Sequence, residues 1–314
     1  MAQYLDSNGK EKVLVLDGGL GTELTRAGFK IDDDPLWSTR TIIENSEAVK
    51  AVHKSFLESG ANIVITATYQ LSYEILHQYC GFDENKALDV IYRSVKIAQG
   101  ACLEVNSNNP KSQRRLLVAG SVGPYGACKH DMSEYSGNYV DEMTIEQLMN
   151  WHRPRVKALL EAGVDILALE TIPAQKEAEA LIQLLKEFPT AKAWLCFSCK
   201  DDSRTCHGEL FSDVVNEIVR QSAQIVAVGV NCTSPQFVKF LLQGIKGKVD
   251  VPFIVYPNGC VDEKFSRGDD EDQVFSSHVS EWIAAGARWI GGCCETQPKD
   301  VAKIRRIVDS IGSP

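Results

Sequence analysis

The sequence predicts a single-domain α/β protein folded as a (β/α)8 barrel, the TIM barrel. Short apolar, β-branched runs alternate with longer helical patterns along all 314 residues. Some of these runs, such as 166–169, are almost continuously apolar, which is typical of strands buried on both faces. Repeated strand–helix units imply right-handed crossovers and a parallel sheet. Eight units of about 35–40 residues each suit a closed barrel.

The expected strands alternate with the expected helices along the chain. The strands are predicted at Val13–Gly19, Asn62–Tyr69, Leu116–Gly123, Ile166–Ile172, Ala193–Cys199, Ile225–Cys232, Phe253–Gly259 and Trp289–Cys294. The helices are predicted near 44–59, 84–106, 144–162, 175–187, 211–223, 235–245, 273–285 and 298–311. We expect one domain over 1–314, with its core at about 13–311. A doubly wound open sheet is the alternative, but the Gly-rich turn 17–21 lacks the dinucleotide-binding spacing.

Composition excludes several classes of protein. Hydrophobic residues make up 44% and charged residues 24%, so the chain can bury a large core. A net charge of −9 argues against nucleic acid or anionic membranes as partners. The acidic run 269–272 is expected to be a solvated loop. Without a signal peptide or a membrane-length apolar run, we expect a cytoplasmic protein whose ten cysteines are reduced, and a monomer.

Polar and special residues gather where the predicted strands end. In a (β/α)8 barrel the carboxyl ends of the strands carry the active site. We therefore expect the active site to be built from these positions: Asp17, Thr68-Tyr69, Gly123-Pro124, Glu170-Thr171, Asn231-Cys232, Pro257-Asn258 and Cys293-Cys294.

Three of these cysteines predict a metal site. Cys232 ends the sixth strand, and Cys293 and Cys294 end the eighth. The sixth and eighth strands are both even-numbered, so their carboxyl ends can converge. Adjacent residues on a regular strand point to opposite faces, so the chain must leave strand geometry if Cys293 and Cys294 are to reach one ion. The glycines 291–292 make that departure easy. Three thiolates leave a tetrahedral zinc ion with one open position, the pattern of a catalytic site.

The other cysteines and the histidines carry weaker signals. Cys196 and Cys199 fall on opposite faces of one strand, so joint ligation is not expected. Cys260, just past the seventh strand, is either an extra ligand, a redox contact or a loop residue. No histidine pair has the spacing of metal ligands on a helix, and His152 and His278 are expected to be surface or hydrogen-bonded residues.

Taken together, these motifs resemble the homocysteine S-methyltransferase family, and they are most similar to its S-methylmethionine/S-adenosylmethionine branch. The similarity extends from about 13 to 308. The segments that carry it are LDGGLGTEL (16–24), DPLWS (34–38), TATYQ (66–70), AGSVGPYGA (119–127), SEYSGNY (133–139), HRPRV (152–156), LALETIP (167–173), VGVNC (228–232), VYPN (255–258) and GGCC (291–294). The chain departs from the usual pattern at 259–261 and at Glu295.

The resemblance implies a zinc-dependent transfer of a methyl group to homocysteine, giving methionine. It assigns zinc to Cys232, Cys293 and Cys294, and the amino group of homocysteine to Asp17 and Glu170. It places the substrate carboxylate at the amides of Gly18, Gly19 and Leu20, and the methyl donor against Trp37. The remaining residues that we expect near substrate are Tyr69, Thr171, Asn231 and Asn258, with Tyr125 and Tyr135 as weaker candidates.

Physical chemistry supports these roles without requiring them. Carboxylates suit an ammonium group, and a sulfonium cation favours an aromatic face. Taken alone, Asp17 could be a turn residue, Glu170 a member of an ion pair and Trp37 part of the core. The alternatives are a thiol redox or sensor protein that uses the vicinal cysteines, and a non-catalytic barrel with a structural zinc ion.

Overall fold

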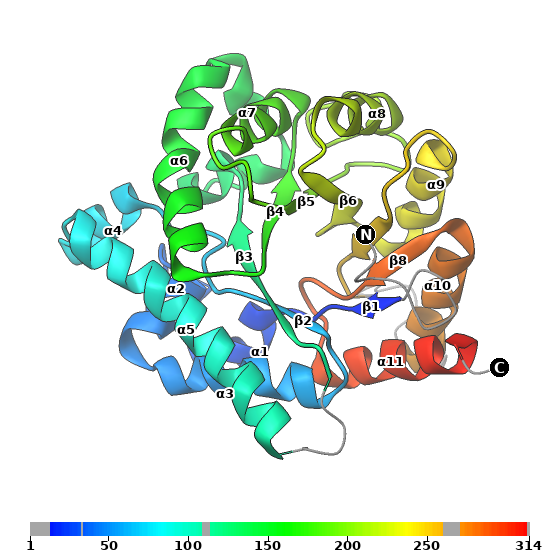
Figure 1. Ribbon diagram of the computed structural model, residues 1–314, viewed down its shortest axis with the longest axis horizontal. Coiled ribbons are helices and arrows are strands. Elements are labelled where there is room, and N and C mark those ends of the chain that lie inside the picture. Colours follow the sequence, from blue (N-terminus) through cyan, green and yellow to red (C-terminus); the bar gives the residue numbers. More distant parts are fainter. Residues whose placement is uncertain (1–12, 33, 109–113, 260–270, 313–314) are drawn as a thin grey trace.

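Eight parallel strands form the barrel in the computed structural model of this chain, which describes residues 13–32, 34–108, 114–259 and 271–312 (Figure 1). The strands are hydrogen-bonded in the order β1-β8-β7-β6-β5-β4-β3-β2. A parallel bridge between Leu16 and Ile63 joins β1 to β2 and brings the two ends of the sheet together. The predicted (β/α)8 fold is thus confirmed, and the open-sheet alternative is wrong.

All strands except β4, which has its predicted bounds, are shorter than the sequence predicts. Most end two to four residues before the predicted end, because the following residues turn into the connections that form the barrel mouth. Their bounds are β1 Leu14–Val15, β2 Ile63–Ile65, β3 Leu117–Val122, β4 Ile166–Ile172, β5 Ala193–Phe197, β6 Ile225–Asn231, β7 Phe253–Tyr256 and β8 Ala287–Ile290.

All eight predicted helices are present. They are α3 Ser46–Glu58, α5 Glu84–Asn108, α6 Ile145–Ala162, α7 Gln175–Leu185, α8 Phe211–Gln221, α9 Pro235–Ile245, α10 Glu271–Ala285 and α11 Pro298–Gly312. Their ends follow sequence signals. In α6, for example, Thr144 and Gln147 form a capping box at the start, and Gly163 adopts a left-handed conformation at the end.

In the described part of the chain, six further short elements were not predicted. They lie in the connections after β1, β2 and β3, and each is too short to show a helical repeat of apolar residues. They are α1 Leu20–Arg26, α2 Ser38–Glu44, α4 Tyr73–Cys80 and the 3-10 helices η3 Tyr125–Lys129, η4 Ser133–Tyr135 and η5 Asn138–Asp141.

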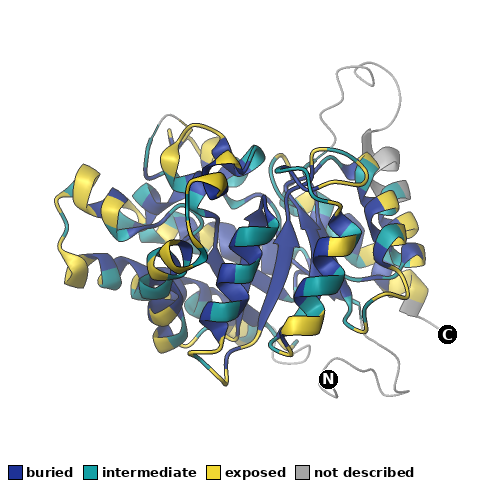
Figure 2. Cartoon of the chain, turned by 90° about the horizontal axis from the view of Figure 1, so that it is seen from above, coloured by how far each residue is buried: buried dark blue, intermediate teal, exposed yellow. Residues whose placement is uncertain are grey.

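The inside of the barrel is a packed core. Alternate strand residues point inward, and three aromatic side chains, Trp194, Tyr256 and Trp289, occupy much of the interior. The rings of Trp194 and Trp289 meet edge to face with centroids 5.9 Å apart. Figure 2 shows the buried strands at the centre, with helices around them that are exposed on their outer sides. Because side chains fill the barrel, a ligand must enter at one end.

Among the described residues, no helix is long and apolar enough to cross a membrane. The acidic run 269–272 and Cys260 lie outside the residues whose side chains the structure describes, so the predictions made for them are not tested.

Candidate active site

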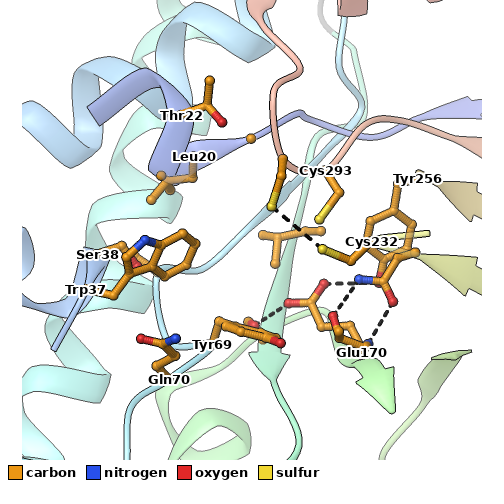
Figure 3. Close-up of a pocket in the computed structure, with 18 of the residues that line it drawn as sticks. Leu20, Thr22, Trp37, Ser38, Tyr69, Gln70, Glu170, Cys232, Tyr256 and Cys293 are labelled. Carbon is orange, nitrogen blue, oxygen red and sulfur yellow. Dashed lines mark hydrogen bonds between the residues drawn. The ribbon is translucent and has the colours of Figure 1, made fainter. Parts of the chain in front are cut away.

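A cavity of about 200 Å³ opens at the carboxyl ends of the strands, where the active site was expected. Figure 3 shows Trp37 and Tyr69 on one side of it and Cys232 and Cys293 on the other. Its lining comes from the ends of β1, β2, β3, β4, β6, β7 and β8 and from the segment around η4. The lining residues include Asp17, Gly18, Gly19, Leu20, Trp37, Tyr69, Ser121, Glu134, Tyr135, Glu170, Thr171, Asn231, Cys232, Tyr256, Cys293 and Cys294.

The three predicted cysteines meet at this cavity. The sulfur atoms of Cys232, Cys293 and Cys294 all lie within 4.8 Å of one another, and those of Cys232 and Cys294 are 3.6 Å apart. In the described part of the chain, this is the one group of three that could hold a metal ion in such a geometry. Cys196 faces the barrel interior and Cys199 the outer core, so their predicted separation is confirmed.

The chain leaves strand geometry before the cysteine pair, as predicted. Strand β8 ends at Ile290, and a turn carries both thiols to the same side. The expected reason was wrong, however, because neither Gly291 nor Gly292 has a positive φ. A Cβ atom on Gly292 would lie 2.3 Å from Oγ1 of Thr296, so the glycine is required by close packing. Cys232 itself has a φ of 47°, a conformation that is costly for a non-glycine residue.

The thiols strongly affect one another's ionisation. Hydrogen bonding with Cys232 lowers the pKa of Cys294 to about 3, and contact with Cys232 raises the pKa of Cys293 well above its usual range. The cluster thus favours one thiolate that neighbouring thiols stabilise. Full ionisation of all three sulfurs needs a cation between them, and thiolates are the ligands that zinc and other soft metals prefer.

Two buried carboxylates lie beside the cysteines. Asp17 is 2% exposed and accepts a 2.8 Å hydrogen bond from the amide of Ile65. Glu170 accepts hydrogen bonds from the Ser121 hydroxyl and, at 3.0 Å, from the Tyr256 hydroxyl. Burial raises the pKa of Asp17 well above its usual range, and it raises the pKa of Glu170 to about 7. Each carboxylate would ionise fully if a cation bound next to it.

The cavity contains acidic groups but, among its described lining residues, no lysine or arginine. Its charged lining residues other than the thiols are Asp17, Glu134 and Glu170. The site therefore favours ligands that carry a positive charge.

Thr171 and Asn231 hold each other in place. The amide of Thr171 donates to Oδ1 of Asn231, and Nδ2 of Asn231 donates to the Thr171 hydroxyl, both at 2.7 Å. These bonds stabilise a φ of 58° at Thr171, where the register between β4 and β5 shifts. Both residues line the cavity, but these side chains are already occupied in shaping the strand ends next to Glu170 and Cys232.

The glycine turn after β1 is also part of the cavity wall. Gly18, Gly19 and Leu20 line it, and helix α1 begins at Leu20. The amide of Gly19 donates to Oγ1 of Thr296 at 3.0 Å, so this amide is satisfied by the protein. Thr296, which follows the cysteine pair, thereby ties the two walls of the cavity together.

Trp37 and Tyr69 form an aromatic wall, with ring centroids 6.0 Å apart in an edge-to-face arrangement. The Tyr135 hydroxyl lies 3.0 Å from Sγ of Cys232, so this weaker candidate does reach the site. Tyr125 instead packs against Tyr139 and Trp151. Asn258 is not among the residues that line the cavity, and its contact with substrate stays a prediction.

Several lining residues were not predicted. Ser121 and Tyr256 fix the orientation of Glu170, and both are strand residues with buried side chains, a signal that could have identified them. Glu134 lies in η4, between strands, where no periodic pattern marks it. It belongs to the segment SEYSGNY, whose individual residues the sequence does not rank.

A (β/α)8 barrel with a cluster of three thiols at an acidic and aromatic mouth is the architecture of a barrel enzyme whose site could hold a metal ion and favours a cationic ligand. The family described as Homocysteine S-methyltransferase matches residues 14–308 of this sequence. The chain belongs to this family of methyltransferase enzymes.

Individual relatives agree with this assignment over nearly their full length. The chain is 38% identical to the homocysteine S-methyltransferase of Escherichia coli (strain K12), over 94% of this chain and 95% of that one. It is 39% identical to a betaine-homocysteine S-methyltransferase of Drosophila melanogaster, over 95% of both chains. The structure of the E. coli homocysteine methyltransferase MmuM in its metallated form has a TM-score of 0.85 to this one, with 95% of this chain and 97% of that chain covered.

Proposed function

We propose that this enzyme transfers a methyl group from a sulfonium donor, S-methylmethionine or S-adenosylmethionine, to the thiol of L-homocysteine in a zinc-dependent reaction. The observation that carries the proposal is the position of the three thiols at the edge of an acidic, aromatic cavity. A redox or purely structural role would not require that cavity.

Cys232, Cys293 and Cys294 would hold one zinc ion per chain. Their donor set is three sulfurs, which leaves one position of a tetrahedron for a ligand. A similar protein, MmuM of E. coli, is known in a metallated form, which supports a metal here. When bound, zinc would lower the pKa of the substrate thiol, so that the thiol is present as a nucleophilic thiolate at neutral pH.

Asp17 and Glu170 would bind the ammonium group of homocysteine. Both carboxylates are buried, and after burial itself the charge of Glu170 also helps to raise the pKa of Asp17. An ammonium group between them would restore ionisation of both and provide charge-assisted hydrogen bonds. The amides of Gly18 and Leu20 would receive the substrate carboxylate, in preference to the Gly19 amide that Thr296 already satisfies.

Trp37 and Tyr69 would hold the methyl donor. Their rings face a cavity without basic lining residues in the described chain, which suits a cationic sulfonium group. The walls would exclude water and align the accepting sulfur, the methyl carbon and the leaving sulfur. The leaving group is a neutral thioether, so no general acid is needed. Betaine is also a cationic donor, and a similar protein is named for it.

The test is methionine formation from homocysteine with S-methylmethionine, S-adenosylmethionine or betaine, using zinc-loaded protein. We expect turnover with a sulfonium donor and a loss of at least a thousandfold in Cys293→Ala, together with loss of bound zinc. Cys102→Ala is the matched control, because this buried thiol lies in α5 and belongs to another core cluster. This variant should retain both its turnover and its bound zinc. Zinc-loaded wild-type protein that makes no methionine from either sulfonium donor contradicts the proposal, whether or not betaine supports turnover.

A further inference from the structure

Glu134 is a buried acid that the reaction described above does not use. It is 7% exposed and lines the cavity, and its Oε2 atom has no hydrogen-bond partner among the described residues. Burial raises its pKa above the usual range. An unpaired buried carboxylate costs free energy, so its presence in a cavity calls for a ligand that satisfies it.

The fold fixes the backbone of Glu134 in place. The Ser198 hydroxyl, at the end of β5, donates to the carbonyl oxygen of Glu134 at 3.1 Å. The Gly137 amide donates to the carbonyl oxygen of Ser133 at 2.7 Å, which closes the turn around η4. A Cβ atom on Gly126 would lie 2.7 Å from the Glu134 nitrogen, so only glycine there allows η3 and η4 to pack this closely. Glu134 is thus held against the cavity from two sides.

Glu134 lies on a different part of the cavity wall from the homocysteine acids, because it belongs to η4 and not to a strand end. Burial is the main cause of the raised pKa of Tyr69, one of the two aromatic wall residues, and the charge of Glu134 adds more to it than the charge of Glu170. The next residue, Tyr135, reaches Cys232 with its hydroxyl. Asp17 and Glu170, by contrast, come from β1 and β4 and are tied to Ile65, Ser121 and Tyr256.

A donor such as S-methylmethionine carries two positive groups, and only one fits a fixed carboxylate well. The sulfonium charge disappears as the methyl group leaves, so a carboxylate against it would stabilise the reactant more than the transition state. The α-ammonium charge is unchanged during transfer. A carboxylate bound to it adds affinity and costs nothing in rate.

We propose that Glu134 binds the α-ammonium group of the methyl donor and thereby selects amino-acid sulfonium donors over onium donors that lack an amino group. This inference rests on the proposed function and extends it to donor choice. The bond is a charge-assisted hydrogen bond from the donor ammonium to the Glu134 carboxylate, one oxygen of which has no partner among the described residues.

The test compares two donors in Glu134→Gln and wild-type protein: S-methylmethionine, and dimethylsulfoniopropionate, a sulfonium carboxylate without an ammonium group. We expect the KM for S-methylmethionine to rise about tenfold to a hundredfold in the variant, with kcat within about twofold. The KM values for dimethylsulfoniopropionate and for homocysteine should change by less than about twofold. Glu134→Asp, which keeps the charge, should lie between wild type and Glu134→Gln.

Glu142→Gln is the matched control, because this nearby carboxylate is exposed and does not line the cavity; it should leave every constant unchanged. Calorimetric binding of S-methylmethionine gives a readout independent of turnover, and thermal melting verifies the fold of each variant. An equal loss for both donors, or a rise confined to the KM of homocysteine, overturns the inference. So does unchanged binding of S-methylmethionine by Glu134→Gln, even where wild-type turnover upholds the proposed function. Wild-type protein that binds S-methylmethionine without making methionine rejects the function alone.

Discussion

Two clusters of buried charged residues differ in how completely the protein pairs them. The first consists of the cavity acids Asp17, Glu134 and Glu170. The second, which we call the closed cluster, lies between α6 and α7 and consists of His152, Arg155 and Glu177, all at most 3% exposed. Both are removed from solvent, but only the closed cluster contains its own cation.

Every charged group of the closed cluster has partners within the protein. Glu177 accepts from Nε2 of His152 at 2.8 Å, from the Tyr125 amide at 2.7 Å and from the Tyr139 hydroxyl. Arg155 lies 3.0 Å from Nδ1 of His152, so that nitrogen accepts while Nε2 carries the proton. The cluster is therefore a satisfied network, as a structural role requires.

The closed cluster also supports the wall of the active site. Arg155 donates to the carbonyl oxygens of Tyr69 and Leu71, each at 3.2 Å, and to that of Gly123 at 2.6 Å. These carbonyl groups follow β2 and β3, and one of them belongs to Tyr69, which lines the cavity. The comparison teaches that buried charge serves both regions in different ways: paired charge shapes the cavity wall, and unpaired charge inside the cavity is available to a cationic ligand.

The largest effect is expected from breaking the closed cluster. Arg155→Met removes the cation from a buried network. The three carbonyl groups lose their hydrogen-bond donor, and Glu177 loses the nearby positive charge. We expect the free energy of unfolding to fall by about 3–5 kcal/mol, measured by urea denaturation. Arg153→Met is the matched control, since Arg153 pairs with Glu187 near solvent; it should cost less than about 1 kcal/mol. Equal losses in the two variants would show that the closed cluster is not structural.

Neutralising one acid in each cluster should have opposite effects on stability. Folding raises the pKa of Glu170 from 4.5 to about 7, so its ionisation opposes folding. The stabilising difference is complete below the unfolded pKa and is lost as the pH rises through about 7. Glu170→Gln should therefore stabilise the ligand-free protein by about 1–2 kcal/mol at pH 8.5 and have little effect at pH 4, while homocysteine binding is lost.

The matched variant is Glu177→Gln, which removes a carboxylate that His152 and Tyr139 already satisfy. It should destabilise the protein by about 2–3 kcal/mol at pH 8.5. Thermal melting of both variants across this pH range provides the measurement. Destabilisation by Glu170→Gln at pH 8.5 would mean that the protein itself satisfies this carboxylate, and the distinction between the clusters would fail.

The sequence predicts the barrel and the thiol cluster well, for a physical reason. Strands buried on both faces leave continuous apolar runs, and a parallel barrel brings all their carboxyl ends to one side. Cys232 and the pair 293–294 could therefore be placed together from strand assignments alone, without knowledge of any side-chain contact. The same argument brought Asp17 and Glu170 to the cavity.

Other features depend on contacts that have no local pattern. The positive φ of Thr171 rests on its two hydrogen bonds with Asn231, sixty positions away, and threonine rarely adopts this conformation. Glu134 could not be selected because its importance comes from a missing partner, which only the surrounding packing defines. The requirement for glycine at 292 comes from Thr296, and the sequence gives no measure of that distance.

The smallest expected effect concerns two tryptophans, Trp151 beside the closed cluster and Trp37 in the cavity. They differ as the acids do, because among the described residues one has a cation from the protein and the other does not. The guanidinium carbon of Arg155 lies 4.7 Å from the Trp151 ring centroid, so this ring already has its cation. In the described chain no lysine or arginine lies over Trp37, whose ring faces the cavity. Trp37→Leu should raise the KM of the sulfonium donor about tenfold and leave that of homocysteine unchanged, because a cation–π contact is lost.

Trp37→Phe keeps an aromatic face and should raise the KM of the donor by less than Trp37→Leu does. This comparison separates the electrostatic effect of the ring from simple apolar packing. Trp151→Leu should lower the melting temperature without changing the KM of the donor. If Trp37→Leu and Trp37→Phe instead raise the donor KM equally, Trp37 acts only by its shape. The selectivity for a positive charge would then rest on the carboxylates of the cavity, and the aromatic wall would contribute only to the exclusion of water from the transferring methyl group.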